Sequence, residues 1–487
     1  MMFARGLTIR EAREGLDKGQ FSAVELCKHY FQKIKTENKK LNAFISLNEE
    51  EALESARLTD QRIKKGSIKS ILDGVPLAIK DNLCQKGRKT TAGSQILQDY
   101  VAPYDATVVR LLKEAGAIIL GKTNLDEFAM GSSTENSYFG PSKNPWDLTR
   151  VSGGSSGGSA VAVAADLCVA ALGSDTGGSI RQPASFCGVV GLKPTYGAVS
   201  RFGLIAMASS FDQIGPLSKN VFDSAVLLSF ISQKDLLDAT SVGLKWPKGA
   251  FLQGLKNPRK IKVGLIKESF GEGLDEKVKA ILFKAIEILK DADVELIEVS
   301  LPHLNYALAA YYVIMPAEVS SNLARYDGIR YGLSRLSEER KEEVTLEEVY
   351  SLNRALGFGQ EVKRRIMLGT YLLSAGYYEA FYKKAQKIRR LFTEDFLKAF
   401  STVDFLISPV SPSVAFKLGE KTKDPLLMYL SDIYTVPVNP AGLPAISLPC
   451  GFADNLPVGL QIIASHFEDY SLLQFSQFLE NLLKGRL

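Results

Sequence analysis

Hydrophobic residues recur at helical spacing through the first part of the chain, from Leu7 to about Lys65. The apolar positions that would share one helix face there are Leu26, Tyr30, Phe31 and Ile34. Ser22 stands before this run and Glu25 follows three residues later, which is the capping-box pattern of a helix N-terminus. The pattern predicts a helical N-terminal segment over residues 1–65.

After this segment the pattern changes to short apolar runs that are separated by glycine, proline and helical stretches. The runs that predict strands are Val75–Ile79, Ala117–Leu120, Leu167–Leu172, Val189–Leu192, Ile261–Ile266, Val294–Val299, Phe405–Ile407 and Ala445–Leu448. Helical stretches such as Thr107–Ala115 and Glu276–Asp291 lie between several of them. Alternation of strands and helices predicts an α/β fold, with a sheet covered by helices on both faces.

The length of 487 residues would suggest about three average domains. No linker rich in Pro, Gln or Ser and no internal repeat marks a boundary, however. The charged run Glu338–Glu348 is interpreted as a solvated helix face. We therefore expect one domain over residues 1–487: the helical segment 1–65, a core 66–220 that carries the candidate active-site loops, and the remainder 221–487.

Composition excludes several classes of protein. The longest apolar-rich stretch, Ala160–Gly173, is interrupted by Asp166, so no membrane-spanning helix is predicted. The segment Met1–Gln20 contains three acids and no apolar core, so we expect neither a secretory nor a transit peptide, and a cytoplasmic protein. The 59 Lys and Arg against 54 Asp and Glu give a net charge of +5, which is too small to indicate nucleic-acid binding.

Cysteine and histidine are both scarce. The five cysteines are odd in number, widely spaced and without a CxxC pair: Cys27, Cys84, Cys168, Cys187 and Cys450. A disulfide framework or a zinc site is therefore not expected. His29, His303 and His466 are far apart in the chain, so the usual general base and metal ligand is in short supply.

Two clusters of glycine and serine are the strongest candidates for function, Ser152–Ser159 and Ser174–Ser179. Such runs are often flexible linkers. Here, however, the first passes directly into the apolar run Ala160–Ala165, and the second follows an apolar strand. Where such a loop opens a helix, its N–H groups converge on an anion or oxyanion. Both clusters are interpreted as active-site loops.

A phosphate ligand is one alternative, because Gly116–Thr123 fits the expression GxxxxGK[ST]. In a phosphate-binding loop the four intervening residues must form the loop itself, after a strand. Here they are the apolar run Ala117–Leu120, which predicts a strand. The context therefore argues against nucleotide binding, and Lys122 is expected to have a local structural role.

An amide- or ester-cleaving site needs a nucleophile, a base and oxyanion donors. The loops supply serines and backbone donors, but no histidine lies near them in sequence. Lys80 is the best substitute, because it ends the apolar run Val75–Ile79. Lysine is almost wholly protonated at neutral pH, so it can act as a base only if its surroundings, such as an apolar site, lower its pKa. Taken alone, Lys80 would be read as a solvated charge.

The combination of Lys80, Ser155 and Ser179 resembles the catalytic set of the amidase signature family, Ser-cisSer-Lys, and the resemblance covers nearly the whole chain. It implies a mixed, twisted sheet. It also implies that Ser179 is the nucleophile, that Ser155 is a bridging serine in a cis peptide bond, and that Lys80 is the base. The oxyanion would be held by backbone N–H groups at the end of the second cluster: Thr176, Gly177, Gly178 and Ser179.

Further strings are similar to the A subunits of the glutamyl- and aspartyl-tRNA amidotransferases within that family: Gly121–Ser133, Gly188–Gly197 and Ser200–Gly203. This resemblance implies a glutaminase that supplies ammonia to a partner, in a complex with subunits B and C. It implies no cofactor or metal in this chain; ATP and Mg²⁺ would be used by the partner subunit, which would also bind most of the tRNA. A stand-alone amidase of small amides and a non-catalytic nucleotide-binding scaffold remain the alternatives.

Free glutamine carries an ammonium and a carboxylate at the end remote from its amide, so a selective site needs an acid and an arginine. Arg365 and Asp432 match the glutamine-binding positions of the family, and Tyr312 matches a third. By composition alone, Arg365 would be a solvated helix charge and Asp432 a helix cap. Their assignment as substrate-binding residues is therefore implied by the resemblance.

Overall fold

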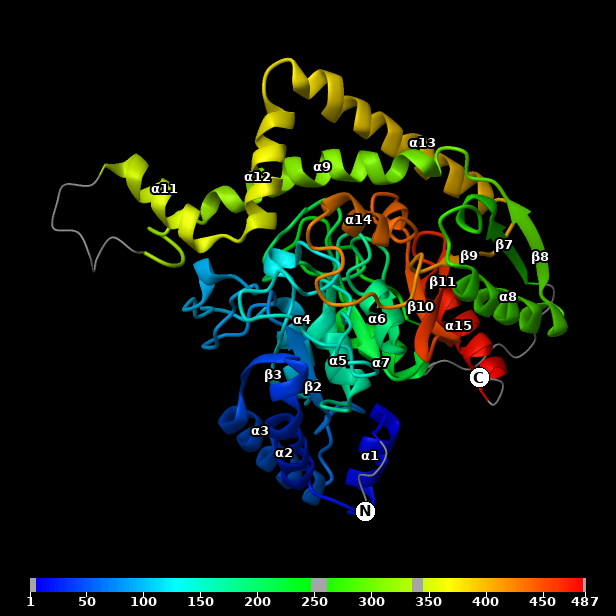
Figure 1. The fold of residues 1–487 in the computed structure, drawn as a ribbon. Helices are drawn as coiled ribbons and strands as arrows, with labels where there is room; N and C mark the ends of the chain where they lie inside the picture. Colours follow the sequence, from blue (N-terminus) through cyan, green and yellow to red (C-terminus); the bar gives the residue numbers. More distant parts are fainter. Residues whose placement is uncertain (1–5, 247–260, 335–344, 485–487) are drawn as a thin grey trace.

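An 11-stranded sheet runs through the centre of the molecule in the computed structural model, which describes residues 6–246, 261–334 and 345–484 (Figure 1). The strands are β1 (Phe44–Leu47), β2 (Pro76–Lys80), β3 (Ile118–Thr123), β4 (Ala170–Asp175), β5 (Val190–Lys193), β6 (Gln213–Ser218), β7 (Lys262–Ile266), β8 (Glu295–Val299), β9 (Phe405–Pro409), β10 (Ala445–Ala453) and β11 (Leu456–Ala464). Their order across the sheet is β1-β3-β2-β4-β6-β5-β10-β11-β9-β7-β8.

The sheet is mixed. β2 runs parallel to β3 and β4, and β7 runs parallel to β8 and β9, whereas the remaining neighbours are antiparallel. Every residue of β2, β3, β4, β5, β6, β9 and β11 is buried. A strand that is buried at each position has cover on both faces, so the predicted α/β architecture is confirmed.

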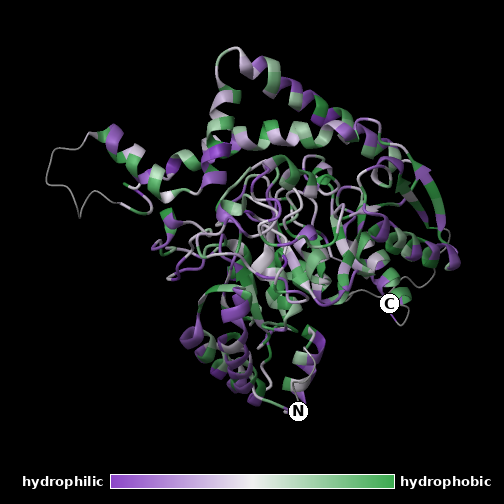
Figure 2. Cartoon of the chain, in the orientation of Figure 1, coloured by the Kyte–Doolittle hydropathy of each residue, from purple (hydrophilic) through white to green (hydrophobic). Residues whose placement is uncertain are grey.

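Helices supply that cover. They are α1 (Ile9–Asp17), α2 (Ala23–Leu41), α3 (Glu49–Lys64), α4 (Thr107–Glu114), α5 (Gly157–Ala164), α6 (Arg181–Cys187), α7 (Val221–Ile231), α8 (Glu276–Asp291), α9 (Ala307–Asn322), α11 (Leu346–Gly357), α12 (Gln360–Leu373), α13 (Lys383–Ala399), α14 (Pro425–Tyr429) and α15 (Asp469–Leu483). Figure 2 shows hydrophobic residues concentrated in the central strands and hydrophilic ones along α3 at the periphery. No helix of these described ranges is long and apolar enough to span a membrane.

The eight predicted strands are all present, although β4 begins three residues later than the run Leu167–Leu172 suggested. The predicted helices Thr107–Ala115 and Glu276–Asp291 correspond to α4 and α8. The capping box of Ser22 and Glu25 is also confirmed at the start of α2. The N-terminal segment is not wholly helical, because its short strand β1 pairs with β3 at the edge of the sheet. Most of the charged run Glu338–Glu348 lies outside the described residues.

Three long helices, α9, α12 and α13, extend along one side of the sheet (Figure 1). α12 packs closely on α9, and Gly369 permits the approach: a Cβ at this position would lie 1.9 Å from the carbonyl oxygen of Pro316. α12 also lies beside the loop that follows β3, because Arg365 lines one cavity with Gly131 and Ser133. The helix is therefore in a position to contribute side chains to a site at the carboxyl ends of the central strands.

Candidate active site

The carboxyl ends of the parallel strands β2 and β4 bring the candidate residues together. Lys80 is the last residue of β2, and Asp175 is the last residue of the adjacent β4. Ser155 lies in the loop that leads into α5, and Ser179 lies between β4 and α6. The ends of adjacent parallel strands are where open α/β sheets form their binding sites.

Lys80 is fully buried and is held by serine oxygens. Its Nζ lies 2.8 Å from Ser155 Oγ, 2.9 Å from Ser156 Oγ and 3.0 Å from Ser174 Oγ. Ser174 Oγ also accepts a hydrogen bond of 2.9 Å from Asn82 Nδ2. None of these contacts is an ion pair, so the site solvates the amine with neutral groups.

Burial lowers the pKa of Lys80 to about 7, and the carboxylates of Asp126, Asp175 and Asp212 only partly oppose that effect. Burial also raises the pKa of Asp126 and of Asp212 to about 6. A lysine with a pKa near 7 is neutral in about half of the molecules at neutral pH, and its lone pair can then accept a proton. The neighbouring Ser155 hydroxyl is within reach to donate it.

The Ser155 loop is fixed by contacts from two directions. The peptide bond between Gly154 and Ser155 is cis, as the family resemblance implies. The Gly154 N–H donates to Gln182 Oε1 over 2.9 Å, and the Ser156 N–H donates to the carbonyl oxygen of Ser179 over 3.0 Å. The second contact joins the two Gly/Ser clusters directly. Gly154 must lack a side chain, because a Cβ there would lie 2.1 Å from Asp126 Oδ2.

The Ser179 loop is shaped by Asp175. Its carboxylate accepts the N–H of Gly178 at 2.8 Å and the N–H of Ile180 at 3.0 Å. It also forms a fully buried, bidentate pair with Arg181, through Nε at 3.1 Å and Nη2 at 3.0 Å. Burial acts to raise the pKa of Asp175, but the Arg181 guanidinium holds it well below its usual range. Asp175 therefore stays ionised and keeps the loop curled around it.

The predicted oxyanion donors are not equivalent. The Gly178 N–H is already donated to Asp175, whereas those of Thr176, Gly177 and Ser179 donate to no acceptor within the described ranges. Gly178 has φ +138°, and a Cβ there would lie 2.1 Å from Thr435 Oγ1. The Ser179 side chain makes no hydrogen bond with any described residue, and 9% of the residue is exposed. The loop thus presents an open hydroxyl beside unpaired N–H groups, which is the arrangement an oxyanion site needs.

Asp432 lies at the end of a short turn of helix, Leu430–Asp432. Its Oδ2 accepts the hydroxyl of Ser132, whereas its buried Oδ1 has no hydrogen-bond partner within the described part of the chain. Burial raises the pKa of Asp432 to about 7, and Ser132 and Arg365 act against that rise. Three residues later, Thr435 Oγ1 donates to the carbonyl oxygen of Gly177 over 2.8 Å. Asp432 is therefore anchored beside the Ser179 loop with one oxygen unused.

Arg365 lies on α12, with 4% of the residue exposed. Its Nε donates to Glu361 Oε1 over 2.8 Å, and the hydroxyl of Tyr429 donates to the same oxygen over 2.8 Å. The guanidinium carbon lies 5.6 Å and 5.5 Å from the ring centres of Tyr312 and Tyr429, which stack on one another. Arg365 also lines a cavity of about 110 Å³ between α12 and the loop that begins at Gly131.

The two adjacent tyrosines of α9 have different surroundings. Tyr312, the predicted substrate-binding residue, stacks on Tyr429 next to Arg365. Tyr311 instead packs on the Ser179 loop, because a Cβ added to Gly177 would lie 2.8 Å from its hydroxyl oxygen. Sequence reasoning missed Tyr311, as well as Ser132, Asp175 and Arg181. The last two lie in or beside the second Gly/Ser cluster, and an ionisable pair next to an active-site loop was the available signal.

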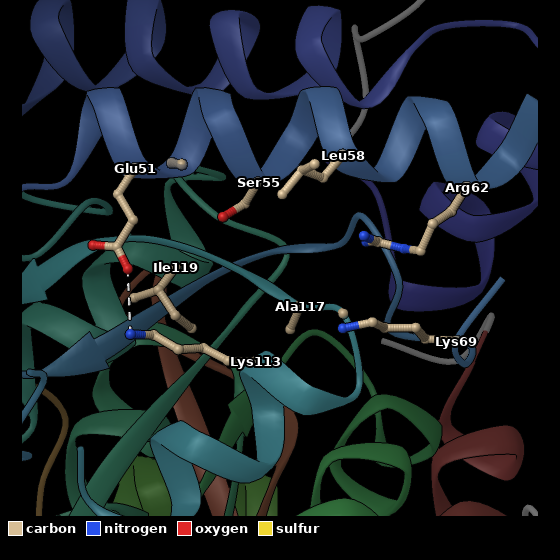
Figure 3. A pocket seen from close by; sticks show the side chains of 10 residues that line it. Glu51, Ser55, Leu58, Arg62, Lys69, Lys113, Ala117 and Ile119 are labelled. Atoms are coloured by element: carbon tan, nitrogen blue, oxygen red, sulfur yellow. Dashed lines mark ion pairs between the residues drawn. The ribbon is translucent and has the colours of Figure 1, made fainter. Parts of the chain in front are cut away.

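The phosphate-loop alternative is not supported. Gly121, Lys122 and Thr123 belong to β3, as the apolar run predicted. Lys122 is fully buried, pairs with Asp81 at 3.2 Å and donates to Leu83 O. The small cavity that Ala117 and Ile119 line is bordered by an ion pair from outside the motif, Glu51 with Lys113, and Lys122 does not line it (Figure 3).

Among the hydrogen bonds of the described residues, none joins a cysteine or a histidine to Lys80, Ser155 or Ser179, although the Cys187 thiol donates to the carbonyl oxygen of Ser152 over 3.3 Å. All five cysteines are buried and free, and burial raises the pKa of each thiol. His303 pairs with Asp395, and His466 contacts the carbonyl oxygen of Ala441. Among the described residues, no group of three or more His, Cys, Asp or Glu side chains is placed to hold a metal ion.

Comparisons with known proteins identify relatives over nearly the whole chain. The amidase family model matches residues 25–473. The glutamyl-tRNA(Gln) amidotransferase A subunit of Caldanaerobacter subterraneus subsp. tengcongensis is 55% identical over 479 residues, covering 98% of this chain and 96% of that protein. The protein of the same name in Coxiella burnetii (strain RSA 493 / Nine Mile phase I) is 54% identical over 474 residues, covering 96% of each.

Two crystal structures have the same fold. The glutamyl-tRNA(Gln) amidotransferase A subunit of Thermotoga maritima is 44% identical, with a TM-score of 0.78 over 96% of this chain and 93% of that one. The native peptide amidase from Stenotrophomonas maltophilia is 29% identical, with a TM-score of 0.81 over 99% of this chain and 98% of that one. The chain therefore belongs to the amidase family.

Proposed function

We propose that this chain is the glutamine-hydrolysing A subunit of a tRNA-dependent amidotransferase. It would release ammonia that a partner subunit uses to convert Glu-tRNA(Gln), Asp-tRNA(Asn) or both to their amidated forms. The relatives at 54% and 55% identity carry the name of that subunit over nearly their whole length. The structural observation that carries the proposal is the buried Oδ1 of Asp432, which lacks a hydrogen-bond partner in the described part of the chain and is anchored beside the Ser179 loop.

Glutamine fits the groups at this end of the site. The ammonium of the substrate would donate to Asp432 Oδ1, a buried acceptor that has no hydrogen-bond partner among the described residues. The carboxylate would accept from the guanidinium of Arg365, whose orientation is set by Glu361 and Tyr429. The ring of Tyr312 would close the same pocket beside Arg365. Each charged hydrogen bond of this kind contributes roughly 1.5–3 kcal/mol.

The reaction would begin when neutral Lys80 accepts the proton of Ser155, and Ser155 accepts the proton of Ser179. Ser179 Oγ then forms a bond to the amide carbon of glutamine, and the negative charge passes to the carbonyl oxygen. The N–H groups of Thr176, Gly177 and Ser179 would hold that oxyanion, each contributing roughly 3–4 kcal/mol. The Gly178 N–H is assigned to loop support, because Asp175 accepts it.

Collapse of the tetrahedral intermediate breaks the C–N bond. The proton returns through Ser155 to the departing nitrogen, so that ammonia leaves and a glutamyl-Ser179 ester remains. Water, deprotonated by the same pair, then attacks the ester, which yields glutamate and restores the Ser179 hydroxyl. The sequence of steps consumes one water, produces one ammonia and needs no cofactor in this chain.

The remaining parts of the proposal concern the assembly. Subunits B and C would bind this chain, ATP and Mg²⁺ would act in the partner subunit, and tRNA would bind mainly there. The modest net charge of +5 is compatible with a protein that handles glutamine rather than nucleic acid. A cytoplasmic location stays a prediction.

A stand-alone amidase is the second candidate, favoured by the overlap with the peptide amidase fold. An assay of ammonia release from glutamine by the purified chain, with and without subunits B and C, ATP and charged tRNA, distinguishes the two. The proposal predicts release that rises when the acceptor tRNA is present and vanishes in Ser179→Ala, while ammonia-dependent amidation by the complex persists. Hydrolysis of aryl or aliphatic amides but not glutamine, unaffected by Asp432→Ala, would favour the stand-alone amidase instead.

A further inference from the structure

The string Gly121–Ser133 contains a buried acid that the proposed mechanism does not use. Glu127 is 3% exposed, and its Oε2 accepts the N–H of Gly359 over 2.8 Å. Gly359 is the N-cap residue of α12 and has no side chain of its own to cap the helix. A carboxylate at this point satisfies an N-terminal N–H and interacts favourably with the helix dipole. The cap of α12 is thus supplied from 232 residues earlier in the chain.

The contact is built for close approach. A Cβ on Gly359 would lie 2.4 Å from Glu127 Oε2, so the helix start can reach the carboxylate only because it is glycine. The other oxygen, Glu127 Oε1, accepts the hydroxyl of Ser94, which also donates to Gly357 O at 3.3 Å. Next to it, the rings of Phe128 and Phe358 pack edge to face with centres 5.7 Å apart. Both sides of the junction between α11 and α12 are therefore held by residues 94–128.

This junction sets the position of Arg365. Arg365 follows Gly359 by six residues, about 9 Å along a helix, so a displacement of the helix start is transmitted to the guanidinium. The residue before Glu127 fixes the opposite side of the pocket: Asp126 accepts the N–H of Thr134 at 2.8 Å. That loop carries Ser132, which binds Asp432. Glu127 therefore supports the side of the pocket that carries Arg365, and Asp126 supports the side that carries Asp432.

We propose that Glu127 is a positioning residue that fixes the start of α12, and thereby the placement of Arg365 relative to Asp432 when the amino-acid end of the substrate binds. The inference rests on the proposed glutaminase function and deepens it. Burial raises the pKa of Glu127 to about 7, with Ser94, Gly359 and Lys363 acting against the rise. Binding is therefore best compared at about pH 8, where most of the carboxylate is ionised.

The test measures the Kd of L-glutamine by calorimetry in Ser179→Ala protein, which cannot turn the substrate over. Adding Glu127→Ala should weaken binding about tenfold. Glu127→Gln retains an oxygen that can accept the Gly359 N–H, so it should remain within about threefold of the Ser179→Ala parent. The matched control is Asp223→Ala, because Asp223 is a buried acid that accepts the N–H of Ile9, the first residue of α1. It should leave the Kd unchanged.

With Ser179 intact, Glu127→Ala should raise KM for glutamine and leave kcat within about twofold. Gly359→Ala, which would push the carboxylate away, gives a second route to the same result if Glu127→Ala does not fold. Unchanged Kd in these variants, or equal losses for Glu127→Ala and Glu127→Gln, would overturn the inference. Failure of the Ser179→Ala parent itself to bind glutamine would instead overturn the proposed function on which it rests.

Discussion

Acidification through pH 7 should switch off turnover, because it protonates Lys80. Burial brings the pKa of this amine from an ordinary value of 10.5 to about 7. At neutral pH about half of the molecules then hold a neutral Lys80, compared with roughly one in 3,000 for an ordinary lysine. The difference corresponds to about 5 kcal/mol in favour of the neutral base. No imidazole is then needed, which fits a chain with three histidines.

The assay is kcat at saturating glutamine between about pH 5 and pH 9. Because the neutral amine is the active form, kcat should fall about tenfold for each pH unit below 7, and it should level off above about pH 8. Asp432 also has a pKa of about 7, and its charged form is the one that would bind the ammonium. Asp432→Asn separates the two groups, since it removes the second titration and leaves that of Lys80.

The rising limb in kcat should therefore persist in Asp432→Asn. A pH-independent kcat over this range, or a limb that disappears with Asp432, would refute the assignment of Lys80 as the base. Lys80→Met supplies a further check, because it removes the amine while keeping an apolar stem of similar length. Its turnover should be lost at every pH.

Three other substitutions test separate parts of the site. Asp432→Asn should raise KM for glutamine by roughly 10- to 100-fold in steady-state kinetics, with kcat within about twofold, because it removes one charged hydrogen bond. An unchanged KM would contradict the proposed contact between Asp432 and the substrate ammonium. Gly178→Ala should lower kcat by about 100-fold or more in a protein that circular dichroism shows to be folded, because a Cβ would lie 2.1 Å from Thr435 Oγ1. Normal turnover would show that the loop accommodates a methyl group without displacing the oxyanion donors. Asp175→Asn should cost about 3–5 kcal/mol of unfolding free energy in urea, because it leaves the buried Arg181 charge without its partner; a loss below about 1 kcal/mol would speak against that pair.

Much of the sheet could be predicted from the sequence, because buried strands read as apolar runs. Of the three strands that were missed, β6 and β1 depart from that pattern, whereas β11 does not. β6 contains Gly215 and Pro216, which normally argue against a strand, and β1 is a short edge strand within a helical segment. β11 follows β10 through Asp454 and Asn455, both with positive φ. That dipeptide was a hairpin signal in the sequence.

The residues of the candidate site differ in how far the local sequence predicts them. Ser155 and Ser179 lie in Gly/Ser clusters whose flanking runs already indicated function. Arg365 and Asp432 could be proposed only from family resemblance, because nothing local distinguishes them from surface charges. The contacts that position these side chains join residues far apart in the sequence: Ser132, which donates to Asp432, lies 300 residues before it. The Gly178 N–H donates to Asp175 and is therefore not available to an oxyanion. This contact depends on the conformation of the loop, which the spacing of residues in the sequence does not predict.

The most direct test of the central claim is to trap the intermediate. Protein that is mixed with glutamine and quenched in acid within a fraction of a turnover should carry a glutamyl group on Ser179, located by mass spectrometry of the peptide. Ser179→Ala should carry none and should release no ammonia. A glutamyl group on another residue, or normal ammonia release by Ser179→Ala, would contradict the proposed mechanism.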